Sequence, residues 1–260
     1  MRHSGSSQRR VVVLGASNVV IGMSVMMETA RQTWGSPLEV LAAVGHGRSF
    51  GRTTRVLGRT LPGILQCDLW EEWQAGHPKP TAALLTDVGN DLMYGSSSAE
   101  IADWVRNCLQ RLRESCDRIV MTELPLESAA TVGPQRFALF RTLFFPGCRI
   151  RWQDTLARAE ELNARLIELA AEFEAILVRP PGQWYGLDPI HIRRQHRPRA
   201  WRQILAPWNS GAEEIAMANS FWQSVRYWHA RPKYRRLLGI EQTKAQPALQ
   251  FPDGTTLSLY

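Results

Sequence analysis

A serine near one end of the sequence and an aspartate–histidine pair far downstream are residue types that catalyse acyl transfer. Ser17 belongs to the run Gly-Ala-Ser-Asn at 15–18, and Asp188 and His191 belong to Asp-Pro-Ile-His at 188–191. An imidazole that takes its proton turns a serine hydroxyl into a nucleophile, and a carboxylate that accepts from the imidazole orients it. If the fold brings these segments together, the three side chains have what ester hydrolysis requires.

Each segment also has a purely structural interpretation. Ser17 precedes a helical pattern, where serine often serves only as a helix cap. Asp188 followed by Pro189 is a common way to begin a helix, and His191 would then have no catalytic part. Both interpretations stay open until the elements between the two segments are considered.

Five short apolar runs alternate with longer segments of helical spacing. The expected strands are 11–14, 38–44, 82–86, 118–122 and 175–179. The expected helices are 19–34, 99–114 and 154–173. Strands that alternate with helices predict a three-layer α/β/α sandwich around a mostly parallel sheet of five strands, one for each run.

Two loops that follow expected strands contain further candidates. Glycines in the loop 44–49 let the backbone approach a ligand, although a tight turn also uses them. In the loop 87–91, the amide of Asn90 can donate to an oxyanion or can merely close a turn. The carboxyl ends of parallel strands share one edge, where open α/β sheets bind ligands. Ser17 and both loops are therefore expected at that edge.

Gly15 does not begin a nucleotide-binding loop. A dinucleotide fingerprint starting there needs glycine at 17 and 20, where the sequence has Ser17 and Val20. The nucleophile elbow of α/β-hydrolases needs a glycine two residues after the serine, and Val19 occupies that place. Both types of site are disfavoured.

The joint order of Ser17, Gly47, Asn90 and Asp188-x-x-His191 resembles the four sequence blocks of the SGNH (GDSL-type) hydrolase family. The resemblance implies a flavodoxin-like sandwich and a serine esterase that cleaves an acyl ester through an acyl-enzyme. Such an ester could be an O-acetyl group on a carbohydrate or a short-chain lipid ester. Ser17 would be the nucleophile, His191 the base and Asp188 the residue that orients it. The N–H groups of Ser17 and Gly47 and the amide of Asn90 would form the oxyanion hole, and no metal or cofactor is implied.

The resemblance is confined to short motifs within residues 10–195, and the motifs depart from the family pattern in places. Ala16 stands where the family usually has an aspartate, Val88 stands where it commonly has a glycine, and Pro189 replaces a small residue. The change at Ala16 removes a polar neighbour of the nucleophile. It favours one alternative, a non-catalytic binding module on the same fold. An O-acyltransferase with the same triad is a further alternative.

Some residues near these motifs are expected to line a substrate pocket. They are Arg48, Met93, Tyr94, Trp184 and Tyr185. Aromatic side chains in such places often belong to the core, so that packing is the alternative role. A small-molecule ester is the expected partner.

The two ends of the sequence differ from its middle. Residues 11–210 are expected to form the hydrolase-like domain, after a flexible N-terminus at 1–10. Residues 211–260 are expected to form a basic, aromatic extension that includes a helix at 213–227 and ends in a hairpin turned at 252–254. This extension could provide the contact of a homo-oligomer.

The net charge of +7 is concentrated downstream, since the window 186–240 has ten Lys or Arg residues and three acidic ones. A solvated basic face is favoured, and no nucleic-acid partner is expected because no nucleic-acid motif accompanies the charge. The hydrophobic fraction of 44% and the charged fraction of 21% are typical of a soluble globular protein. No apolar stretch approaches the ~20 residues of a membrane helix, and a cytoplasmic location is expected.

Overall fold

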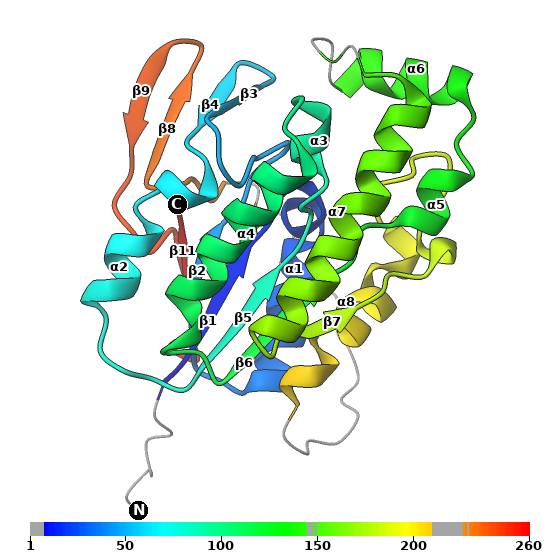
Figure 1. Cartoon of the computed structure of the whole chain (residues 1–260). Coiled ribbons are helices and arrows are strands. Elements are labelled where there is room, and N and C mark those ends of the chain that lie inside the picture. Colours follow the sequence, from blue (N-terminus) through cyan, green and yellow to red (C-terminus); the bar gives the residue numbers. More distant parts are fainter. Residues whose placement is uncertain (1–7, 145–147, 149, 210–225, 228) are drawn as a thin grey trace, which may run out of the picture.

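A seven-stranded sheet forms the centre of the computed structural model, which describes residues 8–144, 148, 150–209, 226–227 and 229–260 (Figure 1). In spatial order its strands are β10 (Leu249–Gln250), β11 (Thr256–Leu259), β2 (Leu38–Ala43), β1 (Arg9–Leu14), β5 (Thr81–Leu85), β6 (Arg118–Thr122) and β7 (Ile176–Val178). Every neighbouring pair is parallel except β10 with β11.

The five strands predicted from the sequence are β2, β1, β5, β6 and β7, and their order is flavodoxin-like. The predicted three-layer fold with a mostly parallel sheet is confirmed, whereas the predicted number of five strands is wrong. The last residues add two strands, because β11 pairs with β2 and places Leu257 beside Val40. The sequence indicated the turn at 252–254, but the alternation of a short strand does not reveal which strand it will pair with.

Helices cover both faces of the sheet. α1 (Ser17–Trp34) and α8 (Arg197–Leu205) pack on one face. α2 (Leu69–Ala75), α4 (Ser98–Arg113) and α7 (Trp152–Glu172) pack on the other, and α4 and α7 cross in front of the sheet in Figure 1. The alternation of side chains along a strand explains these layers. In β1, Val11 and Val13 belong to the α1–α8 core, whereas Val12 and Leu14 belong to the α4–α7 core.

Shorter elements complete the chain. They are α3 (Asn90–Met93), α5 (Leu126–Ala130), α6 (Pro134–Phe144), and the single-turn helices η1 (Ile64–Gln66), η2 (Gly182–Trp184), η3 (Arg194–His196) and η4 (Ala206–Trp208). The predicted helices at 19–34, 99–114 and 154–173 correspond to α1, α4 and α7. Most of the predicted helix at 213–227 lies outside the described residues.

A second sheet, antiparallel and with the strand order β3-β4-β8-β9, stands beside the first (Figure 1). Its strands are β3 (Thr54–Val56), β4 (Arg59–Leu61), β8 (Tyr234–Leu237) and β9 (Ile240–Thr243). Its two hairpins turn through Leu57-Gly58 and Leu238-Gly239, which all have positive φ, as two-residue hairpin turns require. The N–H of Leu238 donates to the oxygen of Gly58 over 2.8 Å. Residues 229–260 therefore contribute strands to both sheets.

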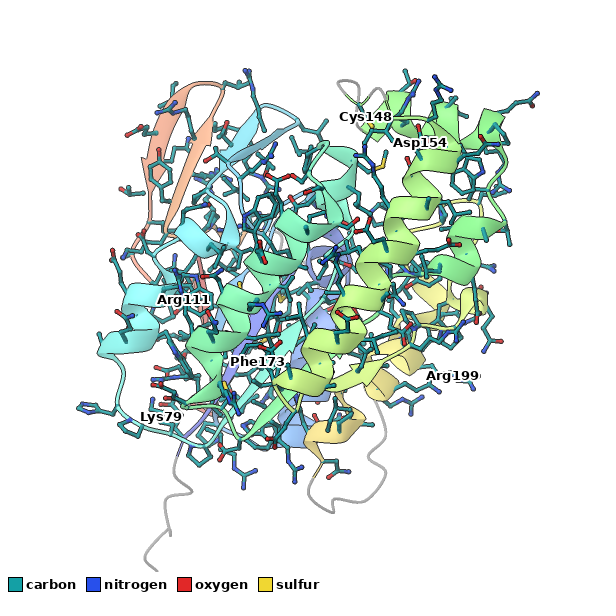
Figure 2. All side chains as sticks on the ribbon, viewed as in Figure 1. Lys79, Arg111, Cys148, Asp154, Phe173 and Arg199 are labelled. Atoms are coloured by element: carbon teal, nitrogen blue, oxygen red, sulfur yellow. The ribbon has the colours of Figure 1, made fainter. Side chains whose placement is uncertain are left out.

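α8 has one buried and one exposed side. Trp201 and Ile204 are buried against the sheet, whereas the exposed Arg199 points away from it (Figure 2). Part of the basic charge downstream is thus on a solvated helix face. Among the described residues, none of the helices combines the length and the hydropathy of a membrane span.

The packing of α8 on α1 depends on Gly22. An alanine inside a helix is normally more stable than a glycine by about 1 kcal/mol. At Gly22, however, a Cβ would lie 2.3 Å from Nε1 of Trp201. We therefore expect Gly22→Ala to lower the free energy of unfolding by about 1–3 kcal/mol, as overpacking does. Urea denaturation measures the change.

Gly133→Ala is the matched control, because no atom of the described residues, apart from its two chain neighbours, lies within 4 Å of the position of its Cβ. We expect this variant to be as stable as the wild type. A Gly22→Ala protein at least as stable as the wild type would contradict the close packing of the two helices.

Candidate active site

Ser17, His191 and Asp188 lie together at the carboxyl edge of the main sheet. Ser17 is the first residue of α1, follows β1 closely and is only 6% exposed. Its Oγ lies 2.8 Å from Nε2 of His191, and Nδ1 of His191 lies 2.5 Å from Oδ2 of Asp188. The structure thus joins the two sequence segments through one chain of hydrogen bonds.

These contacts define the tautomer of a neutral His191. A carboxylate can only accept, so Nδ1 holds the hydrogen that bonds to Asp188. Nε2 is then an acceptor, and it faces the hydroxyl of Ser17. A general base for serine needs this arrangement.

Asp188 closes its own turn and begins no helix. Its Oδ1 accepts from the N–H groups of Ile190 at 3.1 Å and His191 at 3.2 Å, and no helix starts at Pro189. Burial acts to raise the pKa of Asp188, but the hydrogen bonds from the His191 ring and from the two N–H groups outweigh it and hold the pKa below its usual value. The carboxylate is therefore charged where it meets the imidazole.

Asp87 bonds to the residues on both sides of Ser17. Its Oδ2 accepts from the N–H groups of Ala16 at 3.1 Å and Asn18 at 2.9 Å, and its Oδ1 accepts from Nδ2 of Asn18 at 2.8 Å. A carboxylate at the N-terminus of α1 satisfies donors that a helix leaves without partners. Asp87 has a φ of 60°, which aspartate tolerates better than most residues. Burial raises the pKa of Asp87, and the bonds from Asn18 and Ala16 oppose this effect.

Asn18 extends this network to the histidine loop. Its Nδ2 also donates to the oxygen of Ile190 at 2.8 Å, and its Oδ1 accepts from the N–H of Ile192 at 2.8 Å. The residues on either side of His191 are therefore held by the residue next to Ser17. Each bond contributes only about 1 kcal/mol to stability, but together they fix the position of the imidazole relative to the hydroxyl.

Asn18 and Asp87 were not among the site residues predicted from the sequence. The available signal was Ala16, where the carboxylate usual beside the nucleophile is missing, together with an aspartate in the loop 87–91 at the same sheet edge. Only the folded arrangement reveals that Asp87 reaches the N–H groups that flank Ser17.

Asn90 presents a donor without a partner. It is the first residue of α3 and is 8% exposed, and its buried Nδ2 has no hydrogen-bond partner among the described residues. An unsatisfied buried donor is costly and rare in folded proteins. The amide of Asn90 is therefore available to a ligand beside Ser17.

The backbone conformation of Gly47 and the close approach of Tyr94 both require glycine at this position. Its φ is 60°, and a Cβ there would lie 2.6 Å from Oη of Tyr94. Burial lowers the pKa of the adjacent His46, and the charges of Arg59 and His191 lower it further, so this loop lies near the histidine. Within the described part of the chain, no hydrogen bond uses the N–H of Gly47 or of Ser17.

The site has no group of metal-binding side chains. No three His, Cys, Asp or Glu residues of the described chain lie close enough together to hold a metal ion. Asp188 and Nδ1 of His191 bind each other and Nε2 faces Ser17, so the donor atoms of this pair are already engaged.

An apolar cavity of about 130 Å³ opens beside Ser17. It extends from the carboxyl ends of β5 and β6 towards α5, α6 and α7. Of the residues expected to line a pocket, Met93 and Tyr185 do so, and Asn90 lies in the same wall. The cavity therefore lies next to both the hydroxyl and the free amide donor.

Arg48, Trp184 and Tyr94 do not line this cavity, which corrects the expected pocket. Arg48 is fully buried and donates to main-chain oxygens of three other residues, so it holds its loop and is not exposed to a substrate. Trp184 is 1% exposed and belongs to the core beneath α1 and α8. The hydroxyl of Tyr94 donates to the oxygen of Gly47 at 2.6 Å and supports that loop. Proximity to a motif in sequence did not distinguish buried residues from accessible ones.

Comparisons with known proteins find solved structures of similar fold but no match by sequence. No family model matches the sequence, and no curated protein is similar to it in sequence. Est24, a carbohydrate acetylesterase from Sinorhizobium meliloti, superposes with a TM-score of 0.53 at 13% identity over 76% of this chain and 97% of its own. The native aryl esterase of M. smegmatis gives a TM-score of 0.51 at 14% identity over 76% and 96%.

At these identities the similarity shows the fold alone. The chain has the fold of the SGNH (GDSL-type) hydrolases, which confirms the resemblance inferred from its four motifs at the level of fold. The solved structures that share it include esterases and acetylesterases.

The network makes Asp87 more important for stability than Asp188. We expect Asp87→Ala to lower the free energy of unfolding by about 3 kcal/mol, because it leaves the N–H groups of Ala16 and Asn18 without an acceptor and removes one of the two bonds of the Asn18 amide. Asp188→Ala is the matched control, with an expected loss of about 1 kcal/mol, since its side chain is 40% exposed and water can replace it. Urea denaturation of both variants at one pH compares them. A larger loss for Asp188→Ala would contradict this assignment.

Proposed function

We propose that this protein is a serine esterase of the SGNH type, which cleaves an acyl ester through an acyl-enzyme on Ser17. The observation that supports it most is the chain of hydrogen bonds from Ser17 through His191 to Asp188. The free amide of Asn90 and the apolar cavity beside the serine add to this support.

Acylation begins with the transfer of the Ser17 proton to Nε2 of His191 as Oγ attacks the ester carbonyl carbon. The electron pair of the carbonyl bond moves to its oxygen. This oxyanion accepts from the N–H groups of Ser17 and Gly47 and from the amide of Asn90. Donors that are already positioned cost no reorganisation at the moment of reaction.

The tetrahedral intermediate then collapses. The carbon–oxygen bond to the leaving group breaks, and the departing oxygen takes the proton from Nε2 of His191. A water molecule then gives a proton to Nε2 of His191 and attacks the acyl carbon. The bond from this carbon to Oγ of Ser17 breaks, and Oγ takes the proton back from His191, which releases the acid. Asp188 stabilises the imidazolium in both halves.

Asp87 and Asn18 take over the positioning that Ala16 cannot provide. The change at Ala16 favoured a non-catalytic module, because a carboxylate beside the nucleophile was missing. Asp87 supplies a carboxylate beside the nucleophile from another loop, where it accepts from the N–H groups of Ala16 and Asn18. This contact supports the enzyme over the binding module.

The structural neighbours include a carbohydrate acetylesterase and an aryl esterase. A small-molecule ester, such as a carbohydrate O-acetyl ester or a short-chain lipid ester, is accordingly the proposed substrate. Transfer of the acyl group to an alcohol instead of water would use the same residues. Product analysis with and without an added alcohol distinguishes the two, since a transferase forms the new ester in preference to the acid.

A fluorophosphonate probe tests the nucleophile. We expect it to modify the wild type at Ser17, with no modification of Ser17→Ala, because only an activated serine attacks the phosphorus. Mass spectrometry of the peptide that contains residue 17 measures the adduct. A wild-type protein that remains unmodified, while it is folded, would sink the proposal and favour the binding module.

The Asn90 amide should act mainly on turnover. We expect Asn90→Ala to reduce kcat by about 100- to 1000-fold with KM nearly unchanged, as loss of one oxyanion donor does. Asn107→Ala on the exposed side of α4 is the matched control and should keep full activity. Steady-state kinetics on a nitrophenyl ester measures both. A loss below tenfold in kcat would remove Asn90 from the oxyanion hole.

A further inference from the structure

The cavity beside Ser17 has walls that suit a hydrocarbon. Its lining includes Leu124, Val132, Phe137, Trp152, Ala159 and Ile204, which come from the ends of β6 and α5 and from α6, α7 and α8. Ser17, Asn18 and Asn90 line it as well, so that it is continuous with the reacting hydroxyl. A group attached to the carbonyl carbon can therefore pass from Ser17 into this space.

Several polar side chains around the cavity already have hydrogen-bond partners. The hydroxyls of Thr86 and Thr122 bond to each other at 2.8 Å. Glu123 accepts from Nδ2 of Asn163 at 2.8 Å, and the hydroxyl of Thr155 donates to a main-chain oxygen at 2.9 Å. Two lining donors lack a partner among the described residues, Nδ2 of Asn90 and Nε1 of Trp201. Most hydroxyls of a sugar ring in this space would therefore lose water without gaining a partner, at a cost of about 1–3 kcal/mol each. The cavity therefore favours an alkyl chain over a sugar.

The volume of the cavity limits the length of that chain. An apolar cavity of about 150 Å³ accommodates benzene, so 130 Å³ offers room for about five or six carbons. An acetyl group would leave most of it empty. A chain of ten carbons would exceed it.

We propose that the cavity is the acyl-binding site, and that the preferred substrate is an ester of a linear acid of about four to six carbons in preference to an acetate. The inference rests on the proposed esterase function and specifies its substrate class. The alcohol part of the ester lies outside the cavity.

A series of p-nitrophenyl esters tests the chain length. Each buried methylene should raise kcat/KM about fourfold, from about 0.8 kcal/mol of transfer free energy. We expect the butanoate to exceed the acetate by about 15-fold, with a maximum at the butanoate or hexanoate and a decline by the decanoate. An acetate that is hydrolysed as well as the hexanoate would overturn the inference.

Ala129→Leu fills the cavity from α5. Ala129 lines the cavity and is half-buried, whereas its neighbour Ala130 on the same helix is exposed and does not line it. We expect Ala129→Leu to lower kcat/KM for the hexanoate at least about tenfold, as loss of two or more methylene sites requires, and to change the acetate value less than threefold. Ala130→Leu, the matched control, should leave the hexanoate-to-acetate ratio unchanged.

Hydrolysis of the acetate also reports that each variant is folded. If Ala129→Leu hydrolyses both esters in the wild-type ratio, the acyl chain does not enter this cavity and the inference fails while the esterase function stands. If the wild type hydrolyses none of the esters and the fluorophosphonate does not modify Ser17, the proposed function itself fails.

Discussion

The side chain of Asn18 holds together the segments that must meet at Ser17. It binds the carboxylate of Asp87, and it binds the main chain on both sides of His191. An unsatisfied buried amide is costly, and one that makes three hydrogen bonds to two other segments strongly restricts how those segments lie around it. The 2.8 Å contact between the hydroxyl and the imidazole depends on this arrangement.

The parallel sheet supplies the frame for that contact. β1, β2 and β5 end at one edge, and Ser17, Gly47 and Asn90 follow these ends in turn. The helix α1 begins at the nucleophile, so its first N–H groups need an acceptor, and Asp87 provides it. Burial raises the pKa of Asp87, whereas the hydrogen bond from the His191 ring, together with the N–H groups of the turn, holds the pKa of Asp188 below its usual value. The two aspartates thus have different roles. Asp87 binds the main chain beside the nucleophile, and Asp188 binds the imidazole of His191.

Much of the frame could be predicted from the sequence, because it depends on local patterns. The runs around Val12 and Leu84 and the periodicity of α4 specified strands, helices and a parallel sheet. The order of the motifs also predicted that Ser17 and His191 lie together. The pairing of β11 with β2 was missed, because pairing between distant segments leaves no local pattern in the sequence. The burial of Arg48 and the hydrogen bond from Ala16 to Asp87 were missed as well, because they too depend on contacts between distant segments.

Direct detection of the acyl-enzyme tests the central claim. The wild type is mixed with p-nitrophenyl butanoate, quenched in acid within the first turnover, digested and analysed by mass spectrometry. We expect a butanoyl group on the peptide that contains Ser17, and none on that peptide in Ser17→Ala. Release of nitrophenol by the wild type with no acyl group on Ser17, or with the group on another residue, would contradict the mechanism.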